Sequence, residues 1–179
     1  RDSHTSYTDS AIIERLLGKE AAQIINRLRE HRETGRSARM LFEVLGDIWA
    51  VKRNPYLVDD LLKYPKRKEA LVKEMRHRLH EIALRKDKHV EVNLILEKAI
   101  QAVDLFQHSF AHTADLRKKL KAALVKYTRA DNILFDGLSR VSHATDATDW
   151  RVEIPFVVIC PDQEDEIASI VRTLSLIHI

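Results

Sequence analysis

Two histidines, His108 and His112, have the residue type and spacing best suited to binding a metal ion. Residues four apart lie on the same face of a helix, so the two imidazoles could share one ion. The zinc-protease pattern requires a glutamate directly after the first histidine, and Ser109 stands in that place. The sequence suggests no third ligand. We therefore predict a surface pair of histidines and no metal site.

A second group of polar residues lies in the segment 128–150, which is rich in Asp, Thr, Ser and Asn and shows no sustained periodicity. The candidate site residues are Asp131, Asp136, His143, Asp146 and Asp149. Polar side chains on an irregular loop often serve a site, but Asp, Asn and Thr also form turns and helix caps. We expect capping here and assign no catalytic residue, with Trp150 and Arg151 anchoring the loop on the helical part.

Positive charge is concentrated between Lys63 and Lys88, where ten lysines and arginines stand against four acidic residues. Such a run can contact phosphates or anionic lipid. Apolar residues nevertheless recur through it at helical spacing, which indicates the solvated face of an amphipathic helix. These apolar residues are Leu71, Met75 and Leu79. His77 and His80 lie in the same run and are expected to be solvated.

The composition narrows the class of protein. Among 179 residues, 45% are apolar, 32% charged and 6% aromatic, with a net charge of +3, which is typical of a soluble, mostly helical protein. The four glycines stand far apart, which excludes a glycine-rich phosphate-binding loop. Cys160 lies in an apolar run and is expected to be a buried core thiol, not a nucleophile. No apolar run reaches the roughly 18 residues of a transmembrane segment.

The spacing of apolar residues predicts a mainly α chain. The first expected helix is capped by Asp9 or Ser10 and ends at Gly18, because short oxygen side chains favour helix starts and glycine favours helix ends. A second helix is expected over 19–32, and Ser37 is expected to cap a short helix. Further helices are expected over 59–62, 66–85, 90–112 and 116–127.

The helical spacing of apolar residues ends after Tyr127. Residues 155–160 form a continuous, β-branched apolar run that predicts a buried strand, and Asp162 is expected to cap the helix that follows. Strand, turn and helix in this order are the first half of a βαβ unit. A buried strand needs a neighbour for its backbone hydrogen bonds, and the chain offers few candidates. This second domain is therefore expected to be cut short.

Two stretches of the sequence carry a resemblance to a known family. They are Thr34–Trp49, continued by 53–57 and 59–62, and Arg129–Gly137, continued by 140–151 and 155–158. Together they resemble the N-terminal part of large bacterial FAD-linked oxidases and dehydrogenases of the D-lactate dehydrogenase and glycolate oxidase group. In that family an uncharacterised helical domain precedes a flavin domain of the vanillyl-alcohol-oxidase type, often followed by an iron–sulfur domain.

The resemblance implies a parent enzyme that uses FAD to oxidise a small 2-hydroxy acid, in the cytoplasm or peripheral to the inner membrane. It divides the chain into a helical domain (1–127), a linker with the start of the FAD-binding domain (128–173), and a tail (174–179). In the family, the glycines that hold the FAD pyrophosphate follow the next strand. The chain is therefore expected to hold no complete active site and no FAD by itself. Its partner is then the flavin domain of the same polypeptide, with no DNA bound and any iron–sulfur cluster in the parent.

Two alternatives remain open from the sequence. Residues 174–179 resemble translated adapter sequence and are expected to be non-native, the alternative being a native apolar tail that pairs as a strand. The whole chain could instead be a stand-alone basic helical module that binds nucleic acid or a protein partner. The unfinished strand–helix unit after Pro155 favours the flavoenzyme interpretation.

Overall fold

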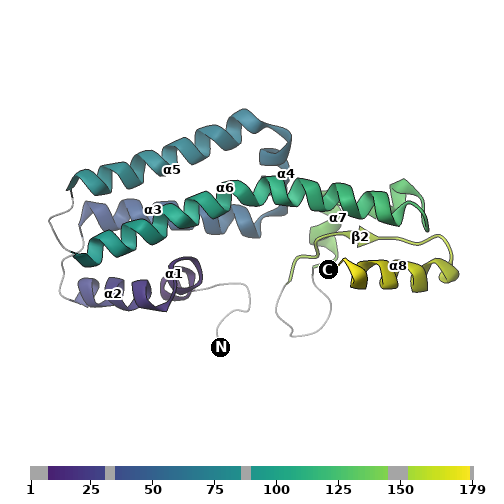
Figure 1. Ribbon diagram of the computed structural model, residues 1–179, viewed down its shortest axis with the longest axis horizontal. Coiled ribbons are helices and arrows are strands. Elements are labelled where there is room, and N and C mark those ends of the chain that lie inside the picture. Colours follow the sequence, from purple (N-terminus) through teal and green to yellow (C-terminus); the bar gives the residue numbers. More distant parts are fainter. Residues whose placement is uncertain (1–7, 31–34, 86–89, 145–152, 178–179) are drawn as a thin grey trace.

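The computed structural model describes residues 8–30, 35–85, 90–144 and 153–177 as an elongated, mainly α molecule (Figure 1). Within these residues the regular structure comprises eight helices, a 3₁₀ turn and a two-stranded sheet, which confirms the predicted mainly α fold. The helices are α1 (Asp9–Leu17), α2 (Lys19–Glu30), α3 (Arg36–Arg53), α4 (Pro55–Lys63), α5 (Pro65–Arg85), α6 (Val90–Leu124), α7 (Gly137–Ser142) and α8 (Glu164–Leu176). The 3₁₀ turn is Ala130–Asn132, and the strands are β1 (Ile133–Leu134) and β2 (Val158–Ile159).

Helices α1, α2, α3, α5 and the first part of α6 share one hydrophobic core (Figure 1). The apolar stripe predicted on α2 faces this core, with Ala21, Ile24 and Ile25 buried. The centre of the core is formed by fully buried side chains of α1, α3, α5 and α6. These are Ile13, Leu45, Ile48, Met75, Val103 and Phe106. Removal of these side chains from water is the main stabilising contribution to the bundle.

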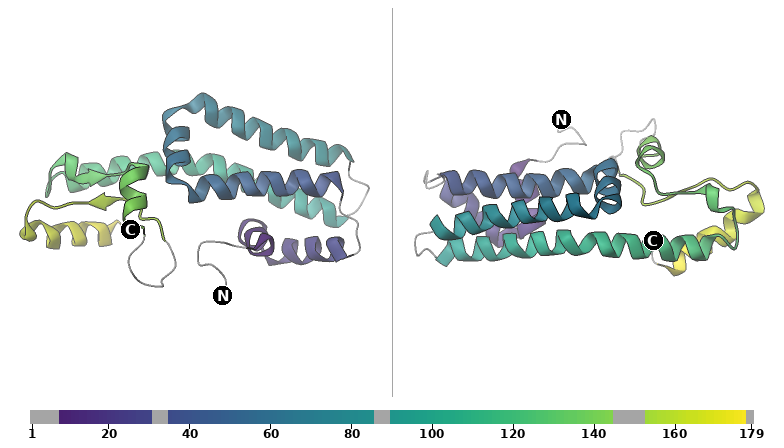
Figure 2. Two further views of the ribbon diagram at one scale, coloured as in Figure 1. Left: turned by 180° about the vertical axis from the view of Figure 1, so that it is seen from behind. Right: turned by 90° about the horizontal axis from the view of Figure 1, so that it is seen from above.

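The C-terminal unit, defined here as residues 130–144 and 153–177, packs around the far end of α6 (Figure 2). A second hydrophobic cluster joins Leu120 and Leu124 of α6 to Ile133 and Ile170 of this unit. Helix α7 lies against α4, and a Cβ built on Gly137 would stand 2.7 Å from Cδ1 of Tyr56. Helix α6 therefore contributes to both clusters without a break, and glycine at 137 permits the close approach of α7 to α4.

Several predicted helix boundaries are wrong by a few residues. Thr8, rather than Asp9 or Ser10, caps α1, because its Oγ1 accepts a hydrogen bond from Ala11 N at 3.3 Å. Gly18 ends α1 with φ of 88°, as predicted. Ser37 does not cap a short helix, since Gly35 holds the cap position and α3 then continues for 18 residues.

The helices predicted over 90–112 and 116–127 are one helix of 35 residues, α6. The intervening residues contain neither proline nor glycine. Since neither strong helix breaker is present, backbone hydrogen bonding continues through this exposed stretch.

The predicted strand over 155–160 is much shorter, because β2 covers only Val158–Ile159. It pairs antiparallel with β1, with Ile133 opposite Ile159 and Leu134 opposite Val158. The neighbouring strand, which the sequence did not identify, therefore comes from the irregular segment before α7. The prediction of a buried Cys160 thiol is wrong, since the side chain is exposed where the short ladder ends.

Asp162 does not cap α8, contrary to prediction, because Gln163 holds the cap position. The Asp162 carboxylate instead accepts hydrogen bonds from Asn132 Nδ2 at 3.0 Å and from Arg129 Nη2 at 2.9 Å. Asn132 is buried and also donates to Thr128 Oγ1 at 2.9 Å. These contacts tie the start of α8 to the 3₁₀ turn before β1.

The end of the described chain is helical. Residues up to Leu176 belong to α8, and Leu174 and Ile177 pack against the second cluster. The alternative of a tail that pairs as a strand is therefore wrong for residues 174–177, while their non-native origin stays a prediction. In the part of the chain that the structure describes, no helix is long and apolar enough to cross a membrane.

Candidate functional site

The two histidines singled out for metal binding lie exposed on α6. His108 Nδ1 is 2.7 Å from the carbonyl oxygen of Asp104, one turn earlier on the same helix. Among the described residues, no group of three or more histidine, cysteine, aspartate or glutamate side chains could hold an ion. The pair therefore has no third ligand within reach in this part of the chain.

The polar residues of segment 128–150 do not converge on one place where they are described. Asp136 caps α7, accepting hydrogen bonds from the backbone N of Ser139 at 2.9 Å and from its hydroxyl at 2.7 Å. These bonds lower the pKa of Asp136. His143 Nδ1 lies 2.8 Å from the Ser139 carbonyl oxygen, and Asp131 is exposed on the 3₁₀ turn. Asp146, Asp149, Trp150 and Arg151 lie outside the described residues.

The basic run is described from Lys63 to Arg85 and forms the end of α4 and all of α5. Its arginines form ion pairs with neighbouring carboxylates: Arg67 with Asp60 at 2.7 Å, Arg76 with Asp104 at 2.8 Å, Arg78 with Asp47 at 2.9 Å and Arg85 with Glu81 at 2.9 Å. His77 and His80 are exposed, as expected. Much of the positive charge of this run is therefore balanced within the molecule.

A different basic site, which sequence reasoning did not single out, lies where the bundle meets the C-terminal unit. We call it the junction pocket, a cavity of about 220 Å³ lined by polar or aromatic residues and by Pro55, Val58 and Ile154. The polar and aromatic residues are Arg15 of α1, Trp49, Lys52 and Arg53 of α3, Arg140 of α7, and Glu153 before β2. Four cationic side chains and one carboxylate thus line the same cavity.

Two of the cations are held against the indole of Trp49. The guanidinium carbon of Arg15 lies 5.8 Å from the ring centroid, and that of Arg53 lies 5.5 Å from it. Such cation–π contacts favour positive charge beside the ring. Trp49 therefore helps to gather guanidinium groups from α1 and from the end of α3 in one place.

Partial burial disfavours the charged forms of the other two cations, Lys52 and Arg140. Burial lowers the pKa of Lys52, and the positive charge of Arg15 lowers it further. Burial likewise lowers the pKa of Arg140, and Arg117 adds to that shift. Arg140 Nε donates to the carbonyl oxygen of Pro155 at 2.7 Å, but its Nη1 is buried with no hydrogen-bond partner among the described residues.

An ion pair between α6 and α4 lies close to Arg140 of the junction pocket. Arg117 Nη2 of α6 donates to Asp59 Oδ1 of α4 at 2.7 Å, and both side chains are largely buried. The Arg117 guanidinium also lies over the ring of Phe135, 5.5 Å from its centroid. The Asp59 carboxylate favours the charged form of Arg140 as well, so one carboxylate serves two cations.

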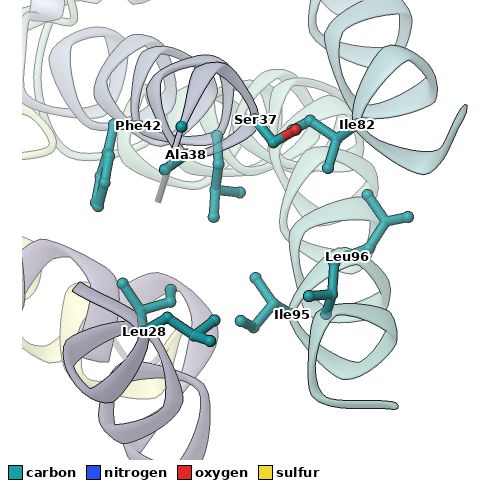
Figure 3. A pocket seen from close by; sticks show the side chains of 11 residues that line it. Leu28, Ser37, Ala38, Phe42, Ile82, Ile95 and Leu96 are labelled. Atoms are coloured by element: carbon teal, nitrogen blue, oxygen red, sulfur yellow. The ribbon is translucent and has the colours of Figure 1, made fainter. Parts of the chain in front are cut away.

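The bundle also contains an apolar cavity of about 100 Å³, at the end opposite to the C-terminal unit (Figure 3). Leu28 of α2, Phe42 of α3, Ile82 of α5 and Ile95 of α6 face the same space. Ser37 places a hydroxyl group at its edge (Figure 3). None of the described residues that line the cavity is charged, so these residues offer no group for acid–base chemistry.

The junction pocket escaped sequence reasoning because its cations come from positions 15, 52, 53 and 140. The one local signal is the adjacent pair Lys52-Arg53 shortly after Trp49, of which only Arg53 belongs to the stretches that carry the family resemblance. Comparison with curated proteins and with solved structures gave no match. One family model, described as a protein of unknown function (DUF3683), matches residues 3–108, which cover most of the bundle, and the chain therefore belongs to the DUF3683 family.

Proposed function

We propose that this chain is the N-terminal part of an FAD-dependent oxidoreductase that oxidises a small 2-hydroxy acid of the D-lactate or glycolate type. In this proposal the DUF3683 bundle is a non-catalytic module, and the C-terminal unit is the opening of the flavin domain. The observation that carries the proposal is the order of elements after Gly137. Strand β2 is followed by the Pro161-Asp162 turn and by α8, whose first turn contains Glu164, Asp165 and Glu166. The resemblance described above implies this order.

The surface of the C-terminal unit supports a larger domain around it. A sheet of two short strands is marginal by itself, and each strand here has only two residues. Several apolar side chains are also exposed, including Leu138 at 67%, Val171 at 58% and Leu176 at 75%. Another part of the protein would cover these side chains in the proposed full enzyme.

The described residues do not provide an FAD pyrophosphate cradle. Such a cradle needs neighbouring glycines whose backbone N–H groups can approach the anion, and the four glycines stand far apart. Gly137, the one closest to the strands, already has the ring of Tyr56 against it. FAD would supply the hydride acceptor in the parent enzyme. We assign no catalytic step to this chain.

The test uses the longer polypeptide that contains this chain, purified beside the 179-residue chain. We expect the longer protein to carry flavin absorbance that bleaches anaerobically on addition of D-lactate or glycolate. The 179-residue chain should purify colourless. A longer protein without flavin, or flavin that no 2-hydroxy acid bleaches, would refute the proposed activity. Stoichiometric flavin on the short chain would refute the assignment of the FAD site to a later segment.

The alternative of a stand-alone basic module for nucleic acid or a protein partner receives less support. The arginines of its basic run are ion-paired with neighbours, which weakens the field available to a phosphate backbone. A gel shift with duplex DNA at low salt tests this alternative directly. Binding that weakens steeply as salt increases would favour the module over the flavoenzyme fragment.

A further inference from the structure

We propose that the junction pocket binds a phosphate group, either free phosphate or the phosphate of a small organic ester. The inference rests on the residues of this chain and does not depend on the proposed flavin chemistry. It assigns a ligand to the interface between the DUF3683 bundle and the C-terminal unit.

The first argument is the charge of the lining. Lys52, Arg140, Arg15 and Arg53 line one cavity with Glu153 as the one carboxylate among its described lining residues. Partial burial lowers the pKa of Lys52 and of Arg140, and the neighbouring charge of Arg15 lowers that of Lys52 further, so both charged forms are disfavoured without an anion. A bound dianion would offset this repulsion with charge-assisted hydrogen bonds.

The second argument is the presence of hydrogen-bond donors. Lys52 has no ion pair or hydrogen bond with any described residue, so its ammonium group can donate to a ligand. Arg140 is held in position by the hydrogen bond from its Nε to the carbonyl oxygen of Pro155, so its positive charge stays beside the cavity. A guanidinium fixed beside the Lys52 ammonium group favours an anionic ligand.

The third argument is size. A cavity of about 220 Å³ is many times larger than the space needed to hold one water molecule. This space is large enough to accommodate a phosphate or a small phosphate ester.

The test is calorimetric titration of the 179-residue chain at low salt with two probes, inorganic phosphate and glycerol phosphate. D-lactate and sodium chloride at matched ionic strength are the comparison solutes. We expect Lys52→Gln to weaken binding by at least about tenfold, the loss expected for one charge-assisted hydrogen bond. Lys52→Arg keeps the charge and should retain most of the affinity. Lys73→Gln removes an exposed lysine of α5 and serves as the matched control with unchanged affinity.

The folded state and the place of binding can be checked separately. Because Lys52 has no described partner, Lys52→Gln should unfold at the same temperature as the wild type or at a higher one. In a Trp150→Phe background, Trp49 is the sole tryptophan, so its emission should change on phosphate addition. Tighter binding of the ester identifies an organic phosphate as the ligand, and tighter binding of the free ion identifies inorganic phosphate.

Three results would overturn the proposal. The first is no heat and no change in Trp49 emission with either probe. The second is an equal loss of affinity in Lys52→Gln and Lys73→Gln, which would indicate diffuse charge screening. The third is D-lactate binding as tightly as both phosphate probes, which would make the pocket a carboxylate site.

Discussion

Two adjacent aspartates of α4 allow a controlled test of how burial changes the contribution of an ion pair to stability. Asp59 and Asp60 each form an ion pair with an arginine at 2.7 Å. The pair of Asp59 with Arg117 is largely buried, with side-chain exposures of 26% and 18%, respectively. The pair of Asp60 with Arg67 is exposed, at 36% and 63%. The substitutions Asp59→Asn and Asp60→Asn therefore break two ion pairs that differ chiefly in how deeply they are buried.

Asp59→Asn should destabilise the chain by about 2 kcal/mol. Removing one partner from a fully buried ion pair costs about 3–5 kcal/mol, and the residual solvent contact of this pair reduces that figure. Arg117 would keep its charge beside Arg140, with a buried Nε that already lacks a described partner. For a chain of this length the loss corresponds to a decrease of about 6 °C in the midpoint of thermal unfolding. Asp60→Asn should leave the midpoint close to that of the wild type, because exposed ion pairs contribute little.

Thermal and urea unfolding followed by far-UV circular dichroism measure both variants. The double variant Asp59→Asn/Arg117→Leu should recover more than half of the loss, because it removes the uncompensated cation and places an apolar side chain beside Phe135. Equal decreases for Asp59→Asn and Asp60→Asn would refute the reasoning, since burial would then not determine the effect. So would a double variant less stable than Asp59→Asn alone.

Three further predictions concern the C-terminal unit. Asn132→Ala should destabilise the chain by about 1–2 kcal/mol in urea unfolding, because it removes buried hydrogen bonds to Thr128 and Asp162, whereas Asn26→Ala on the exposed face of α2 should have little effect. The Cys160 thiol should react with Ellman's reagent at the same rate in the native chain and in urea, because it is exposed. A thiol that reacts only after denaturation would contradict this prediction. Hydrogen bonds from Asn132 and Arg129 lower the pKa of Asp162, so its stabilising contribution is present above the unfolded value of about 3.9 and is lost as the pH falls through the folded value. Asp162→Asn should therefore flatten the dependence of the unfolding midpoint on pH below about 4, and an unchanged slope would contradict this assignment.

The helices of the bundle could be predicted because apolar periodicity directly reflects burial. Ala21, Ile24 and Ile25 recur at helical spacing, and all three face the core. It was harder to predict where a helix continues than to predict that a helix is present. Two helices were predicted on either side of residues 113–115, but this stretch contains neither glycine nor proline, and α6 runs through it without a break.

The C-terminal unit was predicted less well because its structure depends on contacts distant in sequence. The apolar run over 155–160 indicated a long strand, but ladder pairing with β1 extends over only two residues. Asp162 has the residue type of a helix cap, yet a buried amide from Asn132 and the Arg129 guanidinium compete for its carboxylate. The junction pocket also depends on contacts distant in sequence, since no local pattern places Arg15 beside Lys52 and Arg140.

The unbroken α6 determines the angle at which the bundle and the C-terminal unit face each other. A helix advances about 1.5 Å and turns about 100° with each residue. One residue inserted near Ala114, between the last core residue Phe110 and the second-cluster residue Leu120, would thus turn the C-terminal unit about a third of the way round the helix axis. Seven inserted residues would nearly restore its facing while moving it about 10 Å outward. The number of residues in α6 therefore fixes the relative orientation of the two clusters. An insertion preserves this orientation only when it adds a nearly whole number of helical turns.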